Sequence, residues 1–335
     1  MKIAVLMGGQ SGEHDVSLIS GSSIAKALEK QGHTSINVTI SLEGIWQLDD
    51  GKEVTILPKP SKGLWLVNEN KELPIDVVFP VLHGPKGEDG TVQGLLELAG
   101  LPYVGSGVLG SAAGMDKGVM KALFRDAGIP VPKTILLESM DTEVVETEIG
   151  YPCFIKPANL GSSVGINKAK NLGELEKALQ IAFQYDTRIV VEEAVNDARE
   201  VECSVLGPEP KASLPGEIVP DAEFYTYESK YHSNNSRLII PAELSKEQIK
   251  LIQELAIKAF KAVGAEGLSR IDFFVKKDTG EILLNEINTM PGFTQISMYP
   301  KLWEASGISY GVLVDKLVSL ALEKHQKRSQ LKISR

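Results

Sequence analysis

Short apolar runs that end in glycine-rich or polar segments dominate the first third of the chain. Residues 3–7 and 77–82 are such runs, and each is typical of a buried strand. A helical pattern follows each run; in the first helix Ile24 and Leu28 lie one turn apart. This order predicts a small α/β domain over residues 1–115, with the polar loops at its strand ends facing a ligand.

The central part of the chain, residues 116–207, alternates helices with strands that end in charged residues. A helix is predicted over 117–127, and strands over 151–157 and 188–195. The first of these strands carries Lys156 near its end and runs into a loop rich in Gly and Ser. A lysine beside small residues suits phosphate, because backbone N–H groups can approach the oxygens. The alternative is a flexible hairpin loop without a ligand.

The last part, residues 208–335, begins with a long polar segment. Prolines, aromatic and polar residues without a period fill 207–241, as in a lid or binding loop. A capping box at 245–248 then opens an amphipathic helix. On the strands before this segment, Glu193 and Glu202 are predicted to lie on solvent-exposed faces.

Two β-type runs on either side of Asp-Thr-Gly predict a hairpin near the C-terminal end. The simplest turn is a three-residue loop with Gly280 in the left-handed conformation. Centring the hairpin on Thr279 gives three pairs of facing residues: Phe274 with Leu284, Asp272 with Glu286, and Arg270 with Asn288. Since side chains alternate along a strand, the four polar ones project from one face.

Two acids directly opposite each other repel, so a positive group is expected between them. The face offers carboxylate and amide oxygens and contains neither Cys nor His. Such donors suit a hard cation, above all magnesium shared with phosphate oxygens. The alternative is a structural network in which Arg270 neutralises both acids.

Composition narrows the classes of function. At 335 residues the chain is long enough for two or three domains, and 43% hydrophobic and 24% charged residues are ordinary for a globular protein. A net charge of −9 argues against binding to nucleic acid or to an anionic membrane. The two cysteines, Cys153 and Cys203, form no Cys-x-x-Cys motif and fit a reducing cytosol as buried thiols. Neither a signal peptide nor a membrane-spanning apolar run is expected.

Seven motifs, in order, together resemble the D-alanine–D-alanine ligases of the ATP-grasp superfamily. They are Gly-Gly-Gln-Ser-Gly-Glu-His-Asp-Val-Ser, Leu-His-Gly-x-x-Gly-Glu-Asp-Gly, Gly-Ser-Gly-Val with Met-Asp-Lys, Lys-Pro-Ala-Asn-Leu-Gly-Ser-Ser-Val-Gly, Ser-Lys-Tyr, Ser-Arg-Ile-Asp, and Asn-Glu-Ile-Asn-Thr-Met-Pro-Gly-Phe-Thr. The resemblance covers nearly the whole chain. It implies an α/β N-terminal domain and two α+β lobes that grip ATP between antiparallel sheets.

The resemblance also implies the reaction. ATP phosphorylates the carboxylate of one D-alanine, and the amine of a second attacks the acyl phosphate, which yields the dipeptide for peptidoglycan precursors. The expected cofactor is two Mg²⁺ ions, with Mn²⁺ as a substitute, and the expected state is a cytoplasmic homodimer. Alternatives are a ligase that joins D-alanine to D-lactate or D-serine, or an inactive nucleotide-binding protein. Lys230 and Tyr231 favour the dipeptide.

Residue roles follow from the resemblance by position. The implied catalytic residues are Glu13, Ser162, Tyr231, Arg270 and Gly292. Those implied to hold the two amino-acid substrates are His83, Ser297 and Met298. The implied ATP contacts are Lys117, Lys156, Glu192, Val195, Glu200 and Lys230, with Glu202 as the alternative to Glu200 at the ribose. The implied metal ligands are Asp272, Glu286 and Asn288.

Overall fold

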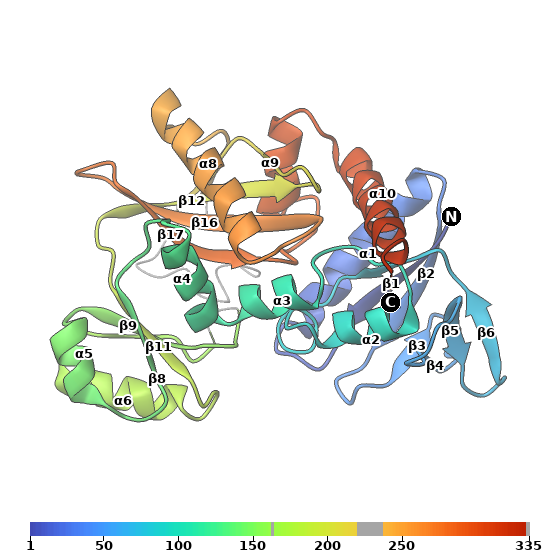
Figure 1. Cartoon of the computed structure of the whole chain (residues 1–335), viewed down its shortest axis with the longest axis horizontal. Helices are drawn as coiled ribbons and strands as arrows, with labels where there is room; N and C mark the ends of the chain where they lie inside the picture. Colours follow the sequence, from blue (N-terminus) through green and yellow to red (C-terminus); the bar gives the residue numbers. More distant parts are fainter. Residues whose placement is uncertain (162–163, 220–236, 333–335) are drawn as a thin grey trace.

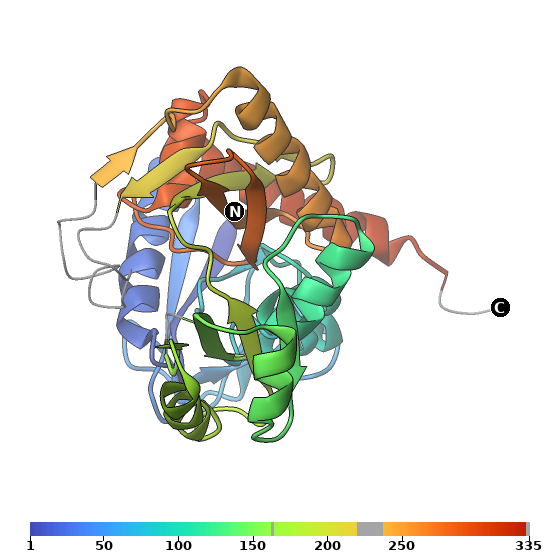
Figure 2. The same ribbon diagram turned by 90° about the vertical axis from the view of Figure 1, so that its left-hand side faces the viewer.

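The computed structural model describes residues 1–161, 164–219 and 237–332. Within these ranges the helices and strands form three bodies: an N-terminal domain, a central lobe and a C-terminal lobe (Figure 1). Turned by 90°, the central lobe lies below the strands of the C-terminal lobe (Figure 2). The predicted combination of an α/β domain and two α+β lobes is therefore confirmed.

The N-terminal domain is built on a sheet of order β3-β2-β1-β7, in which β1 is parallel to β2 and β7. Strand β1 is buried along nearly its whole length, which explains its continuous apolar sequence. A small antiparallel sheet, β4-β5-β6, is attached to it. The elements are β1 (Lys2–Gly8), α1 (His14–Lys30), β2 (Thr34–Ile40), β3 (Trp46–Leu48), β4 (Val54–Thr55), β5 (Gly63–Leu66), β6 (Lys71–Pro74), β7 (Val77–Pro80), α2 (Thr91–Ala99) and α3 (Val108–Met115).

The central lobe is an antiparallel sheet of order β10-β9-β11-β8, with α5 and α6 packed beneath it (Figure 1). Buried and half-buried residues alternate along β9, as expected for a strand with one face on the core. Helix α4 leads into this lobe. The elements are α4 (Lys117–Asp126), β8 (Thr134–Leu137), α5 (Thr142–Glu148), β9 (Cys153–Pro157), β10 (Asn167–Ala169), α6 (Leu172–Ala182) and β11 (Ile189–Glu193).

The C-terminal lobe is an antiparallel sheet of order β15-β14-β12-β16-β17, with β13 paired to β12 and α8 packed on one face. The predicted capping box is confirmed at Ser245 and Gln248, which open α8. The elements are β12 (Ala198–Leu206), β13 (Lys211–Ala212), β14 (Gly216–Val219), β15 (Arg237–Ile239), α8 (Lys246–Ala262), β16 (Leu268–Lys276), β17 (Ile282–Asn288), α9 (Met298–Ala305) and α10 (Tyr310–Ser329).

Two elements lie across the predicted boundary between the lobes. The sequence analysis placed residues 116–207 in the central lobe. Strand β12, however, pairs along its whole length with β16 and so belongs to the C-terminal sheet. Helix α4 contributes Met120 and Phe124 to the hydrophobic core beneath that same sheet. Both cases arise because long-range pairing, rather than order along the chain, decides lobe membership.

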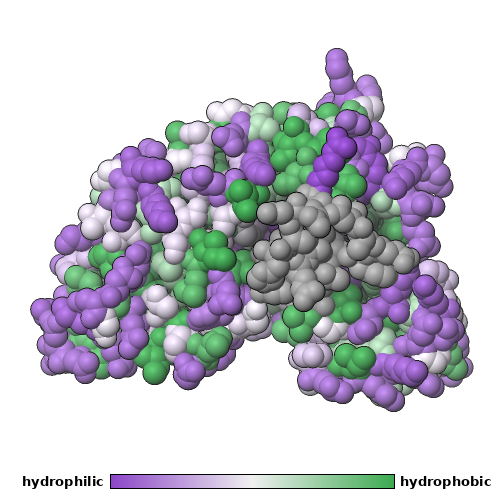
Figure 3. Space-filling model, turned by 180° about the vertical axis from the view of Figure 1, so that it is seen from behind, coloured by the Kyte–Doolittle hydropathy of each residue, from purple (hydrophilic) through white to green (hydrophobic). Residues whose placement is uncertain are grey.

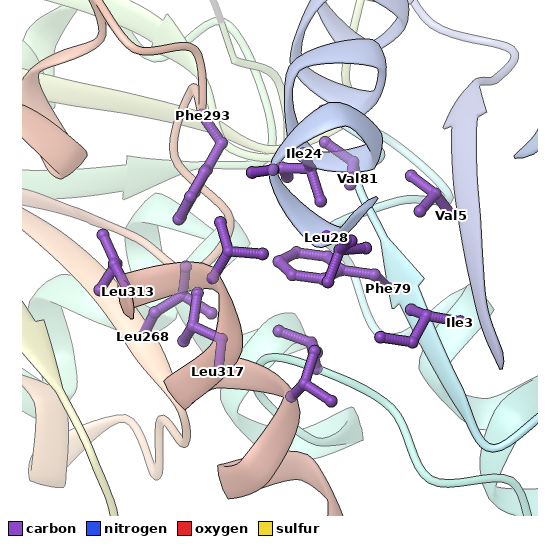
Figure 4. Close-up of a cluster of buried hydrophobic side chains, with 14 of the residues drawn as sticks. Ile3, Val5, Ile24, Leu28, Phe79, Val81, Leu268, Phe293, Leu313 and Leu317 are labelled. Carbon is purple, nitrogen blue, oxygen red and sulfur yellow. The ribbon is translucent and has the colours of Figure 1, made fainter. Parts of the chain in front are cut away.

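One hydrophobic core joins the N-terminal domain to the C-terminal lobe. Figure 4 shows Phe79 of β7 and Leu28 of α1 on one side and Leu317 of α10 on the other. Phe293, from the loop after β17, reaches into the same cluster and lies against Phe79, with ring centroids 6.2 Å apart. The loop after β17 is therefore held by both bodies.

The surface seen from behind carries hydrophilic residues along the outer rims of the molecule (Figure 3). No single helix in the described ranges is both long and apolar enough to cross a membrane. The bent pair α9 and α10 passes that test by length and composition alone.

Candidate active site

The C-terminal hairpin presents the predicted polar face. Asp272 is paired with Glu286, and Arg270 with Asn288, so both of these predicted pairs are confirmed. The predicted pairing of Phe274 with Leu284 is wrong, because Phe274 faces Leu283. The pairs beyond the bulge are therefore displaced by one residue.

Two irregularities of the hairpin compensate for each other. The loop has four residues, 277–280, rather than three, and Gly280 takes the expected left-handed conformation with φ +73°. This longer loop shifts the register by one residue. A β-bulge between Asp272 and Phe273 then takes up Asn285 and restores the register at the acids.

Arg270 supplies a positive group beside Asp272 and Glu202. Its guanidinium donates two hydrogen bonds of 2.7 Å to the carboxylate of Asp272, and its Nε lies 3.0 Å from Oε2 of Glu202. Burial alone would lower the pKa of Arg270, but the two carboxylates outweigh it and raise the pKa. Asn288 also donates to Asp272, at 3.1 Å. Glu202 is buried, so its predicted exposed position is wrong, whereas Glu193 is exposed as expected.

The donor set on this face fits a magnesium ion. In the described ranges, no three His, Cys, Asp or Glu side chains converge as a complete metal centre. Asp272, Glu286 and Asn288 instead offer two carboxylates and one amide, and Mg²⁺ in proteins commonly takes one or two carboxylates together with substrate phosphates.

The central lobe contributes lysines and a buried glutamate. Lys156 of β9 donates to Oε2 of Glu192 on β11, at 2.5 Å, and Lys121 of α4 lies 3.0 Å from Oε1 of the same carboxylate. Burial would raise the pKa of Glu192, but the two ammonium groups lower it to about 2. Lys121 was not predicted from the sequence as a site residue. Its signal was a lysine four residues after Lys117 on a helix face that otherwise carries apolar residues.

The N-terminus of helix α4 lies beside the Gly/Ser-rich loop, because the N–H of Lys117 donates to the carbonyl of Ala158. Asp116 caps the helix by accepting from the N–H of Val119, and it pairs with Arg188. The ammonium of Lys117 donates to the carbonyl of Leu160, at the start of the loop. Lys117 is therefore buried beside the segment that the sequence predicts to hold phosphate.

The N-terminal domain brings His83, Glu13 and Glu88 to the same region. Ser11 donates to the carbonyl of His83, and Nδ1 of His83 lies 3.0 Å from the carbonyl of Met290 in the loop after β17. Nε2 of His83 is buried without a hydrogen-bond partner among the described residues. Burial lowers the pKa of His83, so its ring is neutral near pH 7. Since Nδ1 faces a carbonyl oxygen, it carries the proton of the neutral ring, and Nε2 can accept a hydrogen bond.

The carboxylate of Glu13 lies between two glycines from different parts of the chain. A Cβ on Gly84 would stand 3.1 Å from Oε2 of Glu13, and a Cβ on Gly161 would stand 2.9 Å from it. Glu13 therefore reaches the Gly/Ser-rich loop of the central lobe. Ser162 directly follows Gly161, but it lies outside the described residues, as do Lys230 and Tyr231.

Glu88 is a further acid that the sequence analysis did not single out. It accepts from the N–H of Gly84, at 2.7 Å. Burial, followed by the nearby carboxylate of Glu13, raises the pKa of Glu88 to about 8. The Gly-Glu-Asp-Gly motif was visible in the sequence, but only the fold reveals that Glu88 and Glu13 approach each other.

The raised pKa predicts how stability depends on pH. The folded protein holds a proton on Glu88 that the unfolded chain releases, since its pKa is 4.5 unfolded and about 8 folded. The stabilisation from this group is full below pH 4.5 and is lost as the pH rises through about 8. Glu88→Gln cannot ionise, so its stability does not fall with pH at this position. Its melting temperature relative to the unsubstituted protein should therefore rise across this window.

The control for Glu88→Gln is Glu29→Gln, at an exposed position of α1. Its melting temperature should differ from that of the unsubstituted protein by a constant amount at every pH. A constant difference for Glu88→Gln as well would mean that Glu88 does not hold the proton.

The loop after β17 ends at the N-terminus of α9. Ser297 occupies the N-cap position, and its Oγ accepts from the N–H of Thr294 at 3.0 Å. Met298 is buried against Ile218 and Leu302. A helix N-terminus attracts anions, so this position suits a carboxylate. Gly292 lies close by, since a Cβ there would stand 3.4 Å from Oγ of Ser297.

The two antiparallel lobes thus direct lysines from one side and acids with an arginine from the other toward one region. This is the arrangement of an ATP-grasp enzyme, and it defines the class of the protein. Two family models match the chain: "D-ala D-ala ligase N-terminus" over residues 2–106 and "D-ala D-ala ligase C-terminus" over residues 123–319. The chain belongs to the D-alanine–D-alanine ligase family.

Individual relatives agree with this assignment. The D-alanine–D-alanine ligase of Thermoanaerobacter pseudethanolicus is 50% identical over 352 residues, covering 98% of each chain. The solved D-alanine–D-alanine ligase of Coxiella burnetii is 37% identical, with a TM-score of 0.87 over 98% of this chain and 96% of that one. The VanG D-Ala:D-Ser ligase of Enterococcus faecalis is 38% identical, with a TM-score of 0.87 over 96% and 99%.

Proposed function

We propose that this chain joins two molecules of D-alanine at the expense of ATP, through an acyl phosphate of the first. The observation that supports this most directly is that Lys156 of the central lobe interacts electrostatically with Glu286 and Glu200 of the C-terminal sheet, where Glu286 faces Asp272. A triphosphate and two carboxylate-derived charges need cations and N–H donors around them. The curated relatives at about half identity are all named for this activity.

In this proposal Asp272, Glu286 and Asn288 hold magnesium, which when bound neutralises charge on the phosphate oxygens. Lys117 and Lys156 supply point charges to the same phosphates. Arg270, held rigidly by Asp272, and the N–H of Gly292 stabilise the oxyanion as the amine attacks. Preorganised donors of this kind cost no reorganisation during the reaction.

The amino-acid substrates take the side nearest the N-terminal domain. Glu13 binds the ammonium group of the first D-alanine, and Nε2 of the neutral His83 is a buried partner beside it. Ser297 and Met298, at the N-terminus of α9, receive the carboxylate of the second D-alanine. Ser162 and Tyr231 are the remaining proposed catalytic residues, and their assignment rests on the resemblance to the family.

The nucleoside end of ATP lies in the central lobe. Glu192 and Val195 contact adenine, and Lys230 adds a further phosphate contact by resemblance. Glu200 and Glu202 are two residues apart on β12 and share a face. Because Glu202 is already paired with Arg270, we assign the ribose contact to Glu200.

The test is phosphate release from ATP with D-alanine alone, followed by identification of the product by mass. D-alanyl-D-alanine is expected. D-serine is added in a second arm, because the VanG D-Ala:D-Ser ligase and the Coxiella burnetii D-alanine–D-alanine ligase match this chain with the same TM-score. D-lactate is added in a third arm. A mixed product that dominates over the dipeptide would favour the alternative acceptor, and no phosphate release would favour an inactive nucleotide-binding protein. Cytoplasmic location and the homodimer stay predictions.

Gly161→Ala tests the position of Glu13. The new Cβ would stand 2.9 Å from the end of the flexible Glu13 side chain, so the carboxylate must move while the fold is kept. We expect a higher KM for D-alanine at the first site, by about tenfold, since charge-assisted contacts contribute about 1.5–3 kcal/mol. The melting temperature and the KM for ATP should hold.

The matched control is Gly94→Ala in α2, where a Cβ meets nothing within 4 Å. It should leave every kinetic constant unchanged. An equal rise in the KM for ATP and for D-alanine in Gly161→Ala would indicate a general disturbance of the loop and would not support the role of Glu13.

A further inference from the structure

Lys121 is a buried ammonium group that the proposed reaction does not yet use. Its side chain is 1% exposed, and that of Glu192 is 3% exposed. Nζ of Lys121 lies 3.0 Å from Oε1 of Glu192, yet neither atom makes a hydrogen bond of good geometry with the described residues. Burying a charged group without such bonds costs free energy, so the position of Lys121 requires an explanation.

Helix α4, which carries Lys121, connects the two lobes that enclose the nucleotide. Its apolar residues Met120 and Phe124 belong to the core of the C-terminal lobe, and the helix contacts both β17 and β8 (Figure 1). Two charged side chains face the central lobe: the N-cap residue Asp116 pairs with Arg188, and Lys121 pairs with Glu192. Lys121 therefore forms an ion pair that joins α4 to β11, the strand that contains Glu192.

Glu192 has two lysine partners with different tasks. Lys156 is the one proposed to bind phosphate, so it must give up part of its contact with Oε2 of Glu192 when ATP binds. Lys121 lies against Oε1 instead, and its side chain is buried. Among the described residues, Glu286 of β17 acts electrostatically on both lysines, and Glu200 of β12 acts on Lys156. Among the described residues, Lys121 is then the ammonium group paired with Oε1 of Glu192.

We propose that Lys121 is a positioning residue for nucleotide recognition: it holds the Glu192 carboxylate in place to accept the exocyclic amine of adenine while Lys156 turns to the phosphates. This inference rests on the proposed function only in placing adenine at Glu192. A carboxylate accepts a hydrogen bond from the amine of adenine and repels the carbonyl oxygen that guanine presents at the same ring position. Lys121 thereby contributes to the choice of ATP over GTP.

Without Lys121, Glu192 can adopt two arrangements when ATP is bound, and both are unfavourable. Either it keeps Lys156 and withholds a charge from the phosphates, or it remains a buried carboxylate without a counter-charge and takes up a proton. A protonated Glu192 presents a hydroxyl donor, which suits guanine as well as adenine. Both outcomes weaken ATP binding more than GTP binding.

The experiment measures ATP and GTP binding by calorimetry in the absence of D-alanine, for the full chain and for Lys121→Met. We expect the variant to lose about tenfold to a hundredfold in ATP affinity, the range for a charge-assisted hydrogen bond, and less in GTP affinity. In steady-state assays the KM for ATP should rise while the KM for D-alanine holds. Arg125→Met is the control, because Arg125 lies one turn further on α4 and is exposed.

Glu192→Gln and the double variant Lys121→Met/Glu192→Gln separate positioning from packing. If Lys121 acts through Glu192, the double variant discriminates between the nucleotides as Glu192→Gln does, and the two effects do not add. The double variant contains no buried charge pair at this site, so it also serves if Lys121→Met alone fails to fold. Equal losses of ATP and GTP affinity, or additive effects, would overturn the inference. Binding of ATP without dipeptide synthesis would count against the proposed function alone.

Discussion

Glu286→Gln should remove most of the turnover and leave the protein folded. Glu286 lies directly opposite Asp272, and the pair offers the carboxylates expected to hold magnesium. Loss of one group that stabilises transition-state charge typically lowers kcat by about 10²–10³, and we expect a fall of this size. The melting temperature should hold, because the lost attraction to Arg270 and to the two buried lysines of the central lobe is offset by the lost repulsion from Asp272.

The measurement is kcat as a function of magnesium concentration, together with thermal unfolding. Glu281→Gln is the matched control: it is the same substitution in the same hairpin, at an exposed residue whose partner is Lys276. The control should keep both turnover and melting temperature. Full activity of Glu286→Gln at saturating magnesium would restore the alternative that the acids form only a structural network.

Arg270→Met should lower both turnover and stability. The substitution leaves the carboxylates of Asp272 and Glu202 without their shared guanidinium, in side chains that are 15% and 8% exposed. Removing one partner of such a buried pair costs about 3–5 kcal/mol. The loss of the proposed oxyanion donor should also lower kcat by about 10²–10³ at temperatures where the variant is folded.

Urea unfolding gives the stability, and kcat is measured well below the melting temperature. Arg199→Met is the control, because Arg199 makes a comparable two-bond contact with Glu217 in the same sheet, with 2.8 Å from Nε to Oε1. It should lose stability and keep turnover. If Arg270→Met behaved in the same way, the guanidinium would be a structural counter-charge and not a catalytic group.

The hairpin illustrates what alternation along a strand can predict. A period of two placed Arg270 and Asp272 on one face, and the turn residues Asp-Thr-Gly located the hairpin, so the facing pairs at the site were right. The loop length was not determined by these signals. The bulge at Asn285 absorbs the extra residue, and a bulge depends on packing against neighbouring strands.

Lys121 and Glu88 show why other site residues escaped the sequence analysis. Each is ordinary in its local pattern: one is a lysine on a helix, the other an acid in a turn. Their chemistry arises from partners far away in sequence, Glu192 for Lys121 and Glu13 for Glu88. A pKa shift depends on burial and on nearby charge, and the local sequence specifies neither of them.

The sequence by itself determined the main strands of each sheet, several helices, the positions of the polar loops and, through its ordered motifs, the family. These are local properties, since hydrophobic period, capping and turn chemistry involve residues only a few positions apart. The tertiary structure alone decided that β12 pairs with β16, that α4 packs under the C-terminal sheet while its lysines face the central lobe, and that Glu13 meets Gly161. Such contacts join segments distant along the chain, and their free energy comes from surfaces that exist only once the lobes have formed.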